Sequence, residues 1–259
     1  MPRFAANLSM MFGEVEFLDR FAAAQAAGFD AVEYLFPYDY SPSELSLRLS
    51  DLGLAQALFN LPPGDWESGD RGFAALPGSE DAFDRSLDQA LVYADVLGCP
   101  LLHAMAGIPP ADADPAAVHA TYVANLANAA ERVGACGRTL VIEPINTRTV
   151  PGYFLTRQAQ AMAVIAEVGS PHLALQFDIF HCQIMDGDAE GHLRRQIAAI
   201  RHIQIAGVPD RHEPDTGEVD YRRLFAVMDE LGYAGYVGCE YQPAGDTVAG
   251  LGWFEAVRG

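Results

Sequence analysis

The sequence predicts a single (β/α)8 barrel, or TIM barrel, over residues 1–259, and three observations support this α/β fold class. Short apolar runs alternate with longer helical patterns from one end of the chain to the other, as in βα units. The length suits one barrel domain with an ample core. Finally, four apolar runs in the second half each end on a polar residue, with gaps of 35, 26 and 36 residues between these residues. A barrel of about 250 residues uses roughly 31 residues for each strand and its helix, so the four residues can close four successive parallel strands.

The expected elements alternate without a linker or a low-complexity tract between them. Strands are expected at 3–7, 30–34, 54–59, 100–105, 139–143, 173–178, 201–206 and 236–240. Helices are expected at 14–27, 42–52, 79–97, 115–135, 155–168, 188–199 and 220–231, with a short one after 246. Glycines that end the expected helices act as C-terminal stops, at Gly28, Gly53, Gly98, Gly169 and Gly232. No Gly-x-Gly-x-x-Gly follows the first strand, which argues against a doubly wound dinucleotide-binding sheet.

The composition excludes several function classes. The formal net charge of −19 repels phosphate backbones, so nucleic acid is not expected as a partner. All 16 basic residues are arginines, and without lysine there can be no Schiff-base aldolase chemistry, no covalently held pyridoxal phosphate and no P-loop lysine. The four cysteines are far apart and predict buried free thiols rather than a disulfide or zinc framework. The chain shows no apolar signal region and no run of about 18 apolar residues, so we expect a cytoplasmic protein without a membrane partner.

The polar residues that end the four apolar runs are Glu143, Asp178, Gln204 and Glu240. A (β/α)8 barrel keeps its chemistry at the C-terminal ends of its strands, so these side chains are expected to converge there. Three carboxylates and an amide form an all-oxygen site for Mg²⁺, or for Mn²⁺, whereas zinc prefers nitrogen or sulfur. Each residue alone could instead cap a loop or a helix, satisfy loop backbone or pair with an arginine. All four ending strands in succession favour a divalent metal site.

Four further residues are candidates for contact with a substrate at the same mouth of the barrel. His181, just past the sixth strand, can orient or polarise a substrate oxygen, and His103 lies near the end of the fourth strand. Arg71 and Arg211 can hold a substrate carboxylate, because arginine binds carboxylates through two parallel hydrogen bonds. Arg71 lies in the long loop of residues 60–78, whose length favours a lid or a substrate-binding loop over a tolerated insertion. For the histidines, the alternative is a structural role in a loop. For the arginines, it is an ion pair at the surface.

The reaction that suits these groups is a proton transfer next to a carbonyl. A divalent cation polarises the carbonyl and the adjacent hydroxyl, and so stabilises the developing enediolate. Glu143 and Glu240, expected on the fifth and eighth strands, can remove a proton from one carbon and return one to its neighbour. A carboxylate that also binds the metal needs one uncoordinated oxygen for this role.

Segments along essentially the whole chain resemble the hydroxypyruvate isomerase and 2-oxo-tetronate isomerase family, within the xylose-isomerase-like barrels. These segments lie at 4–12, 60–62, 64–66, 70–72, 143–146, 177–181, 203–211 and 238–241. The Asn-Leu-Ser-Met-Met-Phe stretch at 7–12 and the Gly-Asp-Trp of the long loop are more specific to the isomerase branch. The resemblance implies Glu143 and Glu240 as proton donor and acceptor, and metal ligation by the four strand-end residues. Asn7, in the first segment, is a further candidate for substrate binding.

The resemblance implies a metal-assisted isomerase that converts hydroxypyruvate to tartronate semialdehyde (2-hydroxy-3-oxopropanoate), with 2-oxo-tetronate as the alternative substrate. A ketose 3-epimerase or an inosose-type dehydratase is a further alternative, although sugar epimerases usually have histidine where this chain has Gln204. A non-catalytic metabolite-binding barrel is a third hypothesis, against which both glutamates argue. The expected partner is a small anionic hydroxy-oxo acid, and a homo-oligomer is possible.

Overall fold

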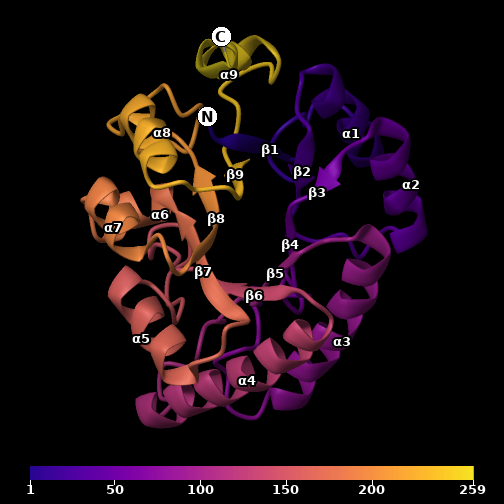
Figure 1. The fold of residues 1–259 in the computed structure, drawn as a ribbon. Helices are drawn as coiled ribbons and strands as arrows, with labels where there is room; N and C mark the ends of the chain where they lie inside the picture. The colour runs from indigo at the N-terminus through magenta and orange to yellow at the C-terminus, as the bar shows by residue number, and fades with distance from the viewer. Residues whose placement is uncertain (259) are drawn as a thin grey trace.

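Nine parallel β-segments form one sheet that curls into a barrel, with the helices on its outside (Figure 1). This computed structural model describes residues 1–258. The β-segments are β1 (Arg3–Asn7), β2 (Ala31–Glu33), β3 (Ala55–Gln56), β4 (Leu58–Asn60), β5 (Leu101–His103), β6 (Thr139–Ile142), β7 (Leu173–Asp178), β8 (Ile200–Ile205) and β9 (Tyr236–Cys239). Their order in the sheet is β3-β2-β1-β9-β8-β7-β6-β5-β4, and the neighbouring strands pair in parallel. The predicted barrel is therefore confirmed.

The barrel closes because its two outer segments, β3 and β4, are the halves of one interrupted strand. Only Ala57 separates them. The Ala57 amide donates to Val32 O at 2.9 Å, and the Asn60 amide donates to Leu35 O at 2.9 Å. Since β4 also pairs with β5, this strand joins both edges of the sheet. The nine segments thus correspond to the eight expected strands, and the strand expected at 54–59 ends one residue later.

The helices follow the strands in the expected alternation, with one addition. They are α1 (Phe17–Ala26), α2 (Pro42–Leu52), α3 (Glu80–Leu97), α4 (Pro115–Ala135), α5 (Gln158–Val168), α6 (Ile179–Met185), α7 (Ala189–Gln196), α8 (Tyr221–Glu230), η1 (Ala249–Leu251) and α9 (Gly252–Arg258). The sequence does not predict α6, because a segment of seven residues is too short to show a helical period. The helix expected at 14–27 begins only at Phe17, and the one expected at 155–168 begins only at Gln158. Gly53 ends α2 at φ 64°, as a C-terminal stop should.

Side chains that point into the barrel change from apolar to polar toward the C-terminal ends of the strands. Two small apolar clusters fill the interior: Ala5, Ala31 and Ala57 with Tyr236, and Leu58, Val141 and Ala174 with Leu101. The main core packs between sheet and helices. Because side chains alternate along a strand, residues two positions beyond an inward alanine also point inward. On β1 and β2 these residues are Asn7 and Glu33, so the same alternation brings polar groups to the mouth.

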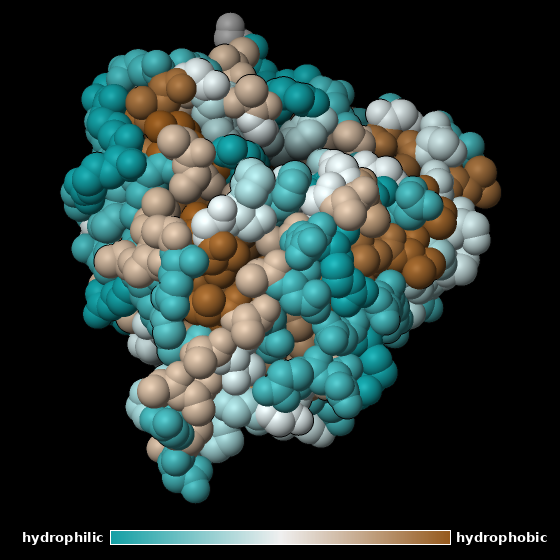
Figure 2. All heavy atoms as spheres, turned by 60° about the horizontal axis from the view of Figure 1, so that its bottom comes forward, coloured by the Kyte–Doolittle hydropathy of each residue, from teal (hydrophilic) through white to brown (hydrophobic). Residues whose placement is uncertain are grey.

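The face drawn in Figure 2 is mostly hydrophilic, with separate apolar areas, in keeping with the acidic composition. All four cysteines are free, as predicted, but Cys136 is exposed, so the expectation of burial is wrong for that residue. Cys99, Cys182 and Cys239 are buried. Across residues 1–258, every helix is too short or too polar to cross a membrane.

Candidate active site

Each strand of the barrel ends in, or next to, a buried polar residue at the C-terminal mouth. These residues are Asn7, Glu33, Asn60, His103, Glu143, Asp178, Gln204 and Glu240. The sequence predicts all but Glu33 and Asn60 as site residues. Both follow the same rule, a polar residue that ends an apolar run. They were missed because the expected strands placed Glu33 inside one strand and Asn60 beyond another.

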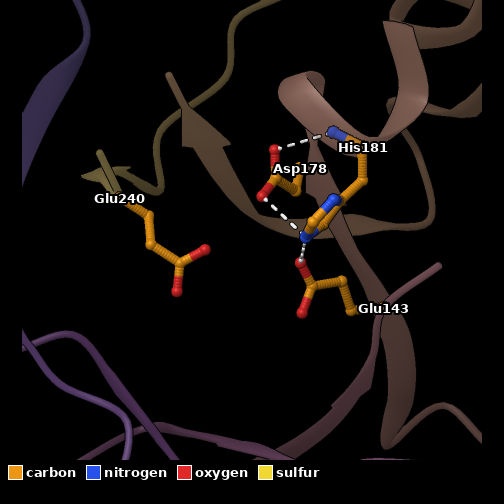
Figure 3. Close-up of side chains that lie close together, drawn as sticks. All are labelled: Glu143, Asp178, His181 and Glu240. Carbon is orange, nitrogen blue, oxygen red and sulfur yellow. Dashed lines mark hydrogen bonds and ion pairs between the residues drawn. The ribbon is translucent and has the colours of Figure 1, made fainter. Parts of the chain in front are cut away.

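Glu143, Asp178, His181 and Glu240 form a buried cluster in which one ligand atom of each lies within 4.8 Å of the others. In Figure 3, Glu240 extends toward the other three from the opposite side. Asp178 caps α6, because its Oδ1 accepts from the amides of Phe180 at 2.7 Å and His181 at 3.3 Å. The cap leaves Asp178 Oδ2 facing the cluster, 3.5 Å from His181 Nε2. The unpredicted helix α6 thus positions two of the four residues.

The cluster has the chemistry of a divalent-cation site. Among residues 1–258, Glu143 Oε1 and Asp178 Oδ2 are buried and have no hydrogen-bond partner. A buried carboxylate oxygen without a partner is costly, and hard cations are bound by carboxylate oxygens. Three converging carboxylates therefore fit a divalent cation, and the cluster could hold a metal ion.

Burial controls the protonation of the two glutamates. It raises the pKa of Glu143 well above its usual range, and the carboxylates of Glu240 and Asp178 raise this pKa further. Burial also raises the pKa of Glu240 to about 8, although the nearby Arg211 guanidinium lowers it. A dication bound beside these groups favours their charged forms, so its binding should release protons.

Asn146 fixes the position of the proton on His181. The Asn146 oxygen accepts from the amides of Arg148 at 3.0 Å and Thr149 at 2.8 Å, so its NH₂ group faces His181 Nδ1 at 2.6 Å. Burial lowers the pKa of His181 to about 4, so the ring is neutral near pH 7. Since Nδ1 accepts, Nε2 carries the proton and points at two cluster carboxylates, 3.5 and 3.7 Å away. His181 is therefore a hydrogen-bond donor in this site rather than a lone-pair ligand.

The two arginines predicted at the site are held differently. Arg211 Nη2 lies 2.6 Å from Glu240 Oε2 and 3.7 Å from Asp178 Oδ2, so it neutralises part of the cluster. The Arg71 guanidinium lies 3.7 Å from the centre of the Trp66 ring and donates to two backbone carbonyls of its own loop. No carboxylate in the described part of the chain forms an ion pair with Arg71. Its charge is thus available to an anion.

A cavity of about 150 Å³ at the mouth connects most of the predicted groups. The predicted residues that line it are Arg71, His103, Glu143, His181, Arg211 and Glu240. Apolar walls come from Met10, Leu35, Trp66, Met105, Ile145 and Val150. Trp66 and Arg71 belong to the loop of residues 60–78, so this loop forms part of the wall. Burial lowers the pKa of His103 to about 3, and its Nδ1 lies 3.2 Å from Asn60 Oδ1.

Asn7 and Gln204 do not line the cavity and are held in hydrogen bonds beside it. Asn7 Nδ2 donates to Glu33 Oε1 at 2.9 Å and to Glu240 Oε1 at 3.3 Å. Gln204 Nε2 donates to Glu33 Oε1 at 2.9 Å, while its Oε1 accepts from Gln176 Nε2 at 2.7 Å. Substrate contact by Asn7 and metal ligation by Gln204 stay predictions.

Comparisons with known proteins identify the family. A sequence profile of xylose isomerase-like TIM barrels matches residues 21–257. The 2-oxo-tetronate isomerase of Cupriavidus necator is 59% identical over 259 residues, which cover 100% of both chains. The hydroxypyruvate isomerase of Escherichia coli is 44% identical over 258 residues, again 100% of both. A crystal structure of AP endonuclease, family 2, from Brucella melitensis has a TM-score of 0.97 and 49% identity, and the match covers 99% of both chains. The chain therefore belongs to the xylose isomerase-like TIM barrels, in the family of the hydroxypyruvate and 2-oxo-tetronate isomerases.

Proposed function

We propose that this protein is an intramolecular isomerase of a small hydroxy-oxo acid that works through an enediolate. The observation that carries the proposal is the convergence of two opposed glutamates and two arginines in one cavity. Relatives named as isomerases of such acids support it. The identity of 59% to a 2-oxo-tetronate isomerase, against 44% to a hydroxypyruvate isomerase, makes 2-oxo-tetronate our first substrate. Hydroxypyruvate, which the sequence alone favours, is the second.

The residues that would hold a divalent cation are Glu143, Asp178, Gln204 and Glu240, with Mg²⁺ the first choice and Mn²⁺ the second. When bound, the cation would polarise the carbonyl and the adjacent hydroxyl of the substrate. The carboxylate-rich donor set supports a hard cation. The tautomer of His181 supports Gln204 as the fourth ligand, because a protonated Nε2 has no lone pair to offer.

Glu143 and Glu240 would move the proton between neighbouring carbons. One carboxylate removes a proton from the carbon that carries the hydroxyl, and a carboxyl group on the other side returns one to the former carbonyl carbon, while the hydroxyl proton passes to the former carbonyl oxygen. Glu143 has one oxygen, Oε1, without a hydrogen-bond partner in residues 1–258, which a base requires. The Nε2–H of His181 would donate to a substrate oxygen as negative charge develops there.

Arg71 is the better candidate to hold the substrate carboxylate. It lines the cavity, and its guanidinium contacts only backbone carbonyls and the Trp66 ring. Arg211 lines the same cavity but is already paired with Glu240. A guanidinium stacked on an aromatic ring keeps its outer edge free for two parallel hydrogen bonds to a carboxylate.

The site supports neither a neutral polyol nor DNA as the first substrate. An epimerase or dehydratase acting on a neutral polyol has no carboxylate for Arg71 to bind. The related structure from Brucella melitensis carries an endonuclease name, but a net charge of −19 opposes a phosphate backbone. A single histidine stands in the cluster, and its Nε2 is a donor.

The test is a side-by-side assay of metal-loaded protein on 2-oxo-tetronate, hydroxypyruvate and a neutral ketohexose, with an EDTA-treated control. We expect turnover of the two acids, fastest for 2-oxo-tetronate, and loss of turnover with EDTA that Mg²⁺ or Mn²⁺ restores. Faster turnover of hydroxypyruvate would keep the mechanism and change the substrate. Turnover of the ketohexose alone would contradict the proposal.

A further inference from the structure

Glu33, at the end of β2, is a buried carboxylate that the mechanism above does not use. It is 0% exposed and does not line the cavity. Its Oε1 accepts from Asn7 Nδ2 and from Gln204 Nε2, each at 2.9 Å. His202 Nε2 donates to its Oε2 at 2.6 Å. A carboxylate without solvent needs several donors, and Glu33 has three from two other strands.

Hydrogen bonds connect Glu33 to both of the proposed proton-transfer groups. On one side, Asn7 Nδ2 lies between Glu33 Oε1 and Glu240 Oε1 and donates to both. Glu240 Oε1 is thus held by the amide, while its Oε2 faces Arg211 in the cluster. Asn7 cannot turn over without losing both contacts, because its own oxygen accepts from the Ser9 amide.

The second connection reaches Glu143 through two amides. Gln176 Nε2 donates to Gln204 Oε1 at 2.7 Å and to Glu143 Oε2 at 3.1 Å. Glu143 Oε2 is thus held, while its Oε1 faces His181 Nε2 at 3.7 Å. On both sides of the site, therefore, one carboxylate oxygen is tied to an amide and the other faces the cluster.

The hydrogen bonds to Glu33 decide which way Gln204 faces. A carboxylate can only accept hydrogen bonds, so it requires the NH₂ group of Gln204 on its own side. If the amide turned over, its oxygen would meet the Glu33 carboxylate and its NH₂ group would meet that of Gln176. The oxygen of Gln204, the atom a metal would need, is therefore kept on the side away from Glu33.

Strand β9, which lies between β1 and β8 in the sheet, makes room for this carboxylate. A Cβ atom at Gly238 on β9 would overlap both carboxylate oxygens of Glu33. Gly238 lies two residues before Glu240 and pairs with Gln204 across the sheet. Because Gly238 has no side chain, the Glu33 carboxylate can occupy the space at this inward position.

We propose that Glu33 is a positioning residue of the isomerase site. Through Asn7 and Gln204, it fixes which oxygen of Glu240 and of Glu143 faces the substrate and the cation, and it keeps the Gln204 oxygen on the side of Gln176. The inference rests on the proposed function, and it adds a residue that contacts neither substrate nor cation.

Two substitutions test it from different sides. Glu33→Leu removes the carboxylate that accepts these hydrogen bonds. Gly238→Ala keeps every polar group in the chain but displaces the carboxylate, because the added Cβ atom needs its space. Removing a side chain that holds a metal ligand in place costs about 10–100-fold in metal affinity or activity. We therefore expect both variants to lose that much in kcat, measured by steady-state assay, and in Mn²⁺ affinity, measured by electron paramagnetic resonance. KM should change little, because Glu33 does not line the cavity. The double variant should be no worse than Glu33→Leu alone, because both changes act on one contact.

Gln56→Leu is the matched control. Gln56 is buried on β3 beside β2, and its amide bonds only the Leu58 carbonyl in the described residues, so its loss should lower Tm without changing kcat or Mn²⁺ affinity. Folded Glu33→Leu protein with wild-type kcat and Mn²⁺ affinity would overturn the inference. If that variant does not fold, Glu33→Gln and Gly238→Ala replace it under the same criterion. If wild-type protein turns over neither acid, the proposed function fails, while Mn²⁺ affinity still decides whether Glu33 positions the ligands.

Discussion

Glu143 and Glu240 face each other across the cavity but are not equivalent. Glu240 has one oxygen bonded to Asn7 and the other paired with Arg211. Glu143 has one oxygen bonded to Gln176, and its other oxygen has no partner within residues 1–258. Burial raises the pKa of both, most clearly for Glu143, where neighbouring carboxylates act in the same direction. We therefore propose that Glu143 accepts a proton from carbon and that Glu240 returns one.

We expect Glu143→Gln and Glu240→Gln each to lower kcat by about 10²–10⁴-fold, the range for removal of a general acid or base. An amide keeps an oxygen for the cation but cannot take up a proton. Steady-state assays on both acids, with bound Mn²⁺ quantified, measure the effect. Glu131→Gln, on the exposed side of α4, is the control. Near-wild-type turnover by either site variant with metal bound would disprove its acid/base role.

The loop of residues 60–78 places the Arg71 guanidinium at the cavity and is held in place by backbone contacts. The Ala74 and Ala75 amides donate to Met105 O and Ala106 O in the loop after β5. Gly72, at φ 97°, packs against Met105 so closely that a Cβ atom would overlap its carbonyl. The loop is therefore a fixed wall in this structure, and Arg71 is presented from it at a set position.

Replacing Arg71 should affect substrate binding more than the chemical step. We expect Arg71→Met to raise KM for both acids by about 10–100-fold, which corresponds to a charge-assisted hydrogen bond of about 1.5–3 kcal/mol. Arg71→Lys should recover only part of this loss, because lysine lacks the planar fork. Arg85→Met, on the exposed surface of α3, is the control. An unchanged KM in Arg71→Met would transfer the carboxylate-binding role to Arg211.

The elements and most of the mouth could be predicted from the sequence, chiefly because both follow local patterns. Where an apolar run ends on Glu143 or Asp178, the same pattern indicates both a strand and a site residue at the C-terminal end of that strand. Helix α6 could not be predicted, because its seven residues after Asp178 are too few to show a helical period. The proton position on His181 could not be predicted either, since it depends on Asn146, which lies 35 residues earlier in the chain and meets His181 only in the fold.

At the scale of the whole molecule, buried ionisable groups link folding stability to pH in two opposite ways. Glu240, with its pKa raised to about 8, binds a proton in the folded protein that the unfolded chain releases near pH 4.5. Its contribution therefore falls as pH rises through this window. His181 and His103, with pKa values lowered to about 4 and about 3 from 6.5, give the opposite slope below pH 6.5. Of these three groups, only Glu240 changes the stability between pH 6.5 and 8.

We therefore expect the Tm of EDTA-treated protein to decrease from pH 6.5 to pH 8, and Mg²⁺ or Mn²⁺ to remove much of this decrease. A bound cation stabilises the charged carboxylates, which burial otherwise disfavours. Differential scanning calorimetry across this range, with and without metal, measures the slope. Glu240→Gln should flatten the slope without metal, and the same decrease in that variant would assign it to another group.

Self-association stays a prediction at this scale. Leu47, Val92 and Val96 are large apolar side chains exposed on the adjacent helices α2 and α3. Sedimentation of the purified protein would give the oligomeric state directly.

The contact between Arg211 and Glu240 means that the cluster contains its own counter-ion. A dication held by Glu240 would compete with the Arg211 guanidinium for the same carboxylate oxygen, so metal binding would have to displace this ion pair. We therefore expect Arg211→Gln to bind Mn²⁺ more tightly than the natural protein, measured by calorimetric titration, even as turnover falls. Equal or weaker binding would show that the guanidinium and the dication do not compete. If the two compete, the arginine would raise the concentration of free metal that the site needs, because a charge from the chain itself already occupies the Glu240 oxygen.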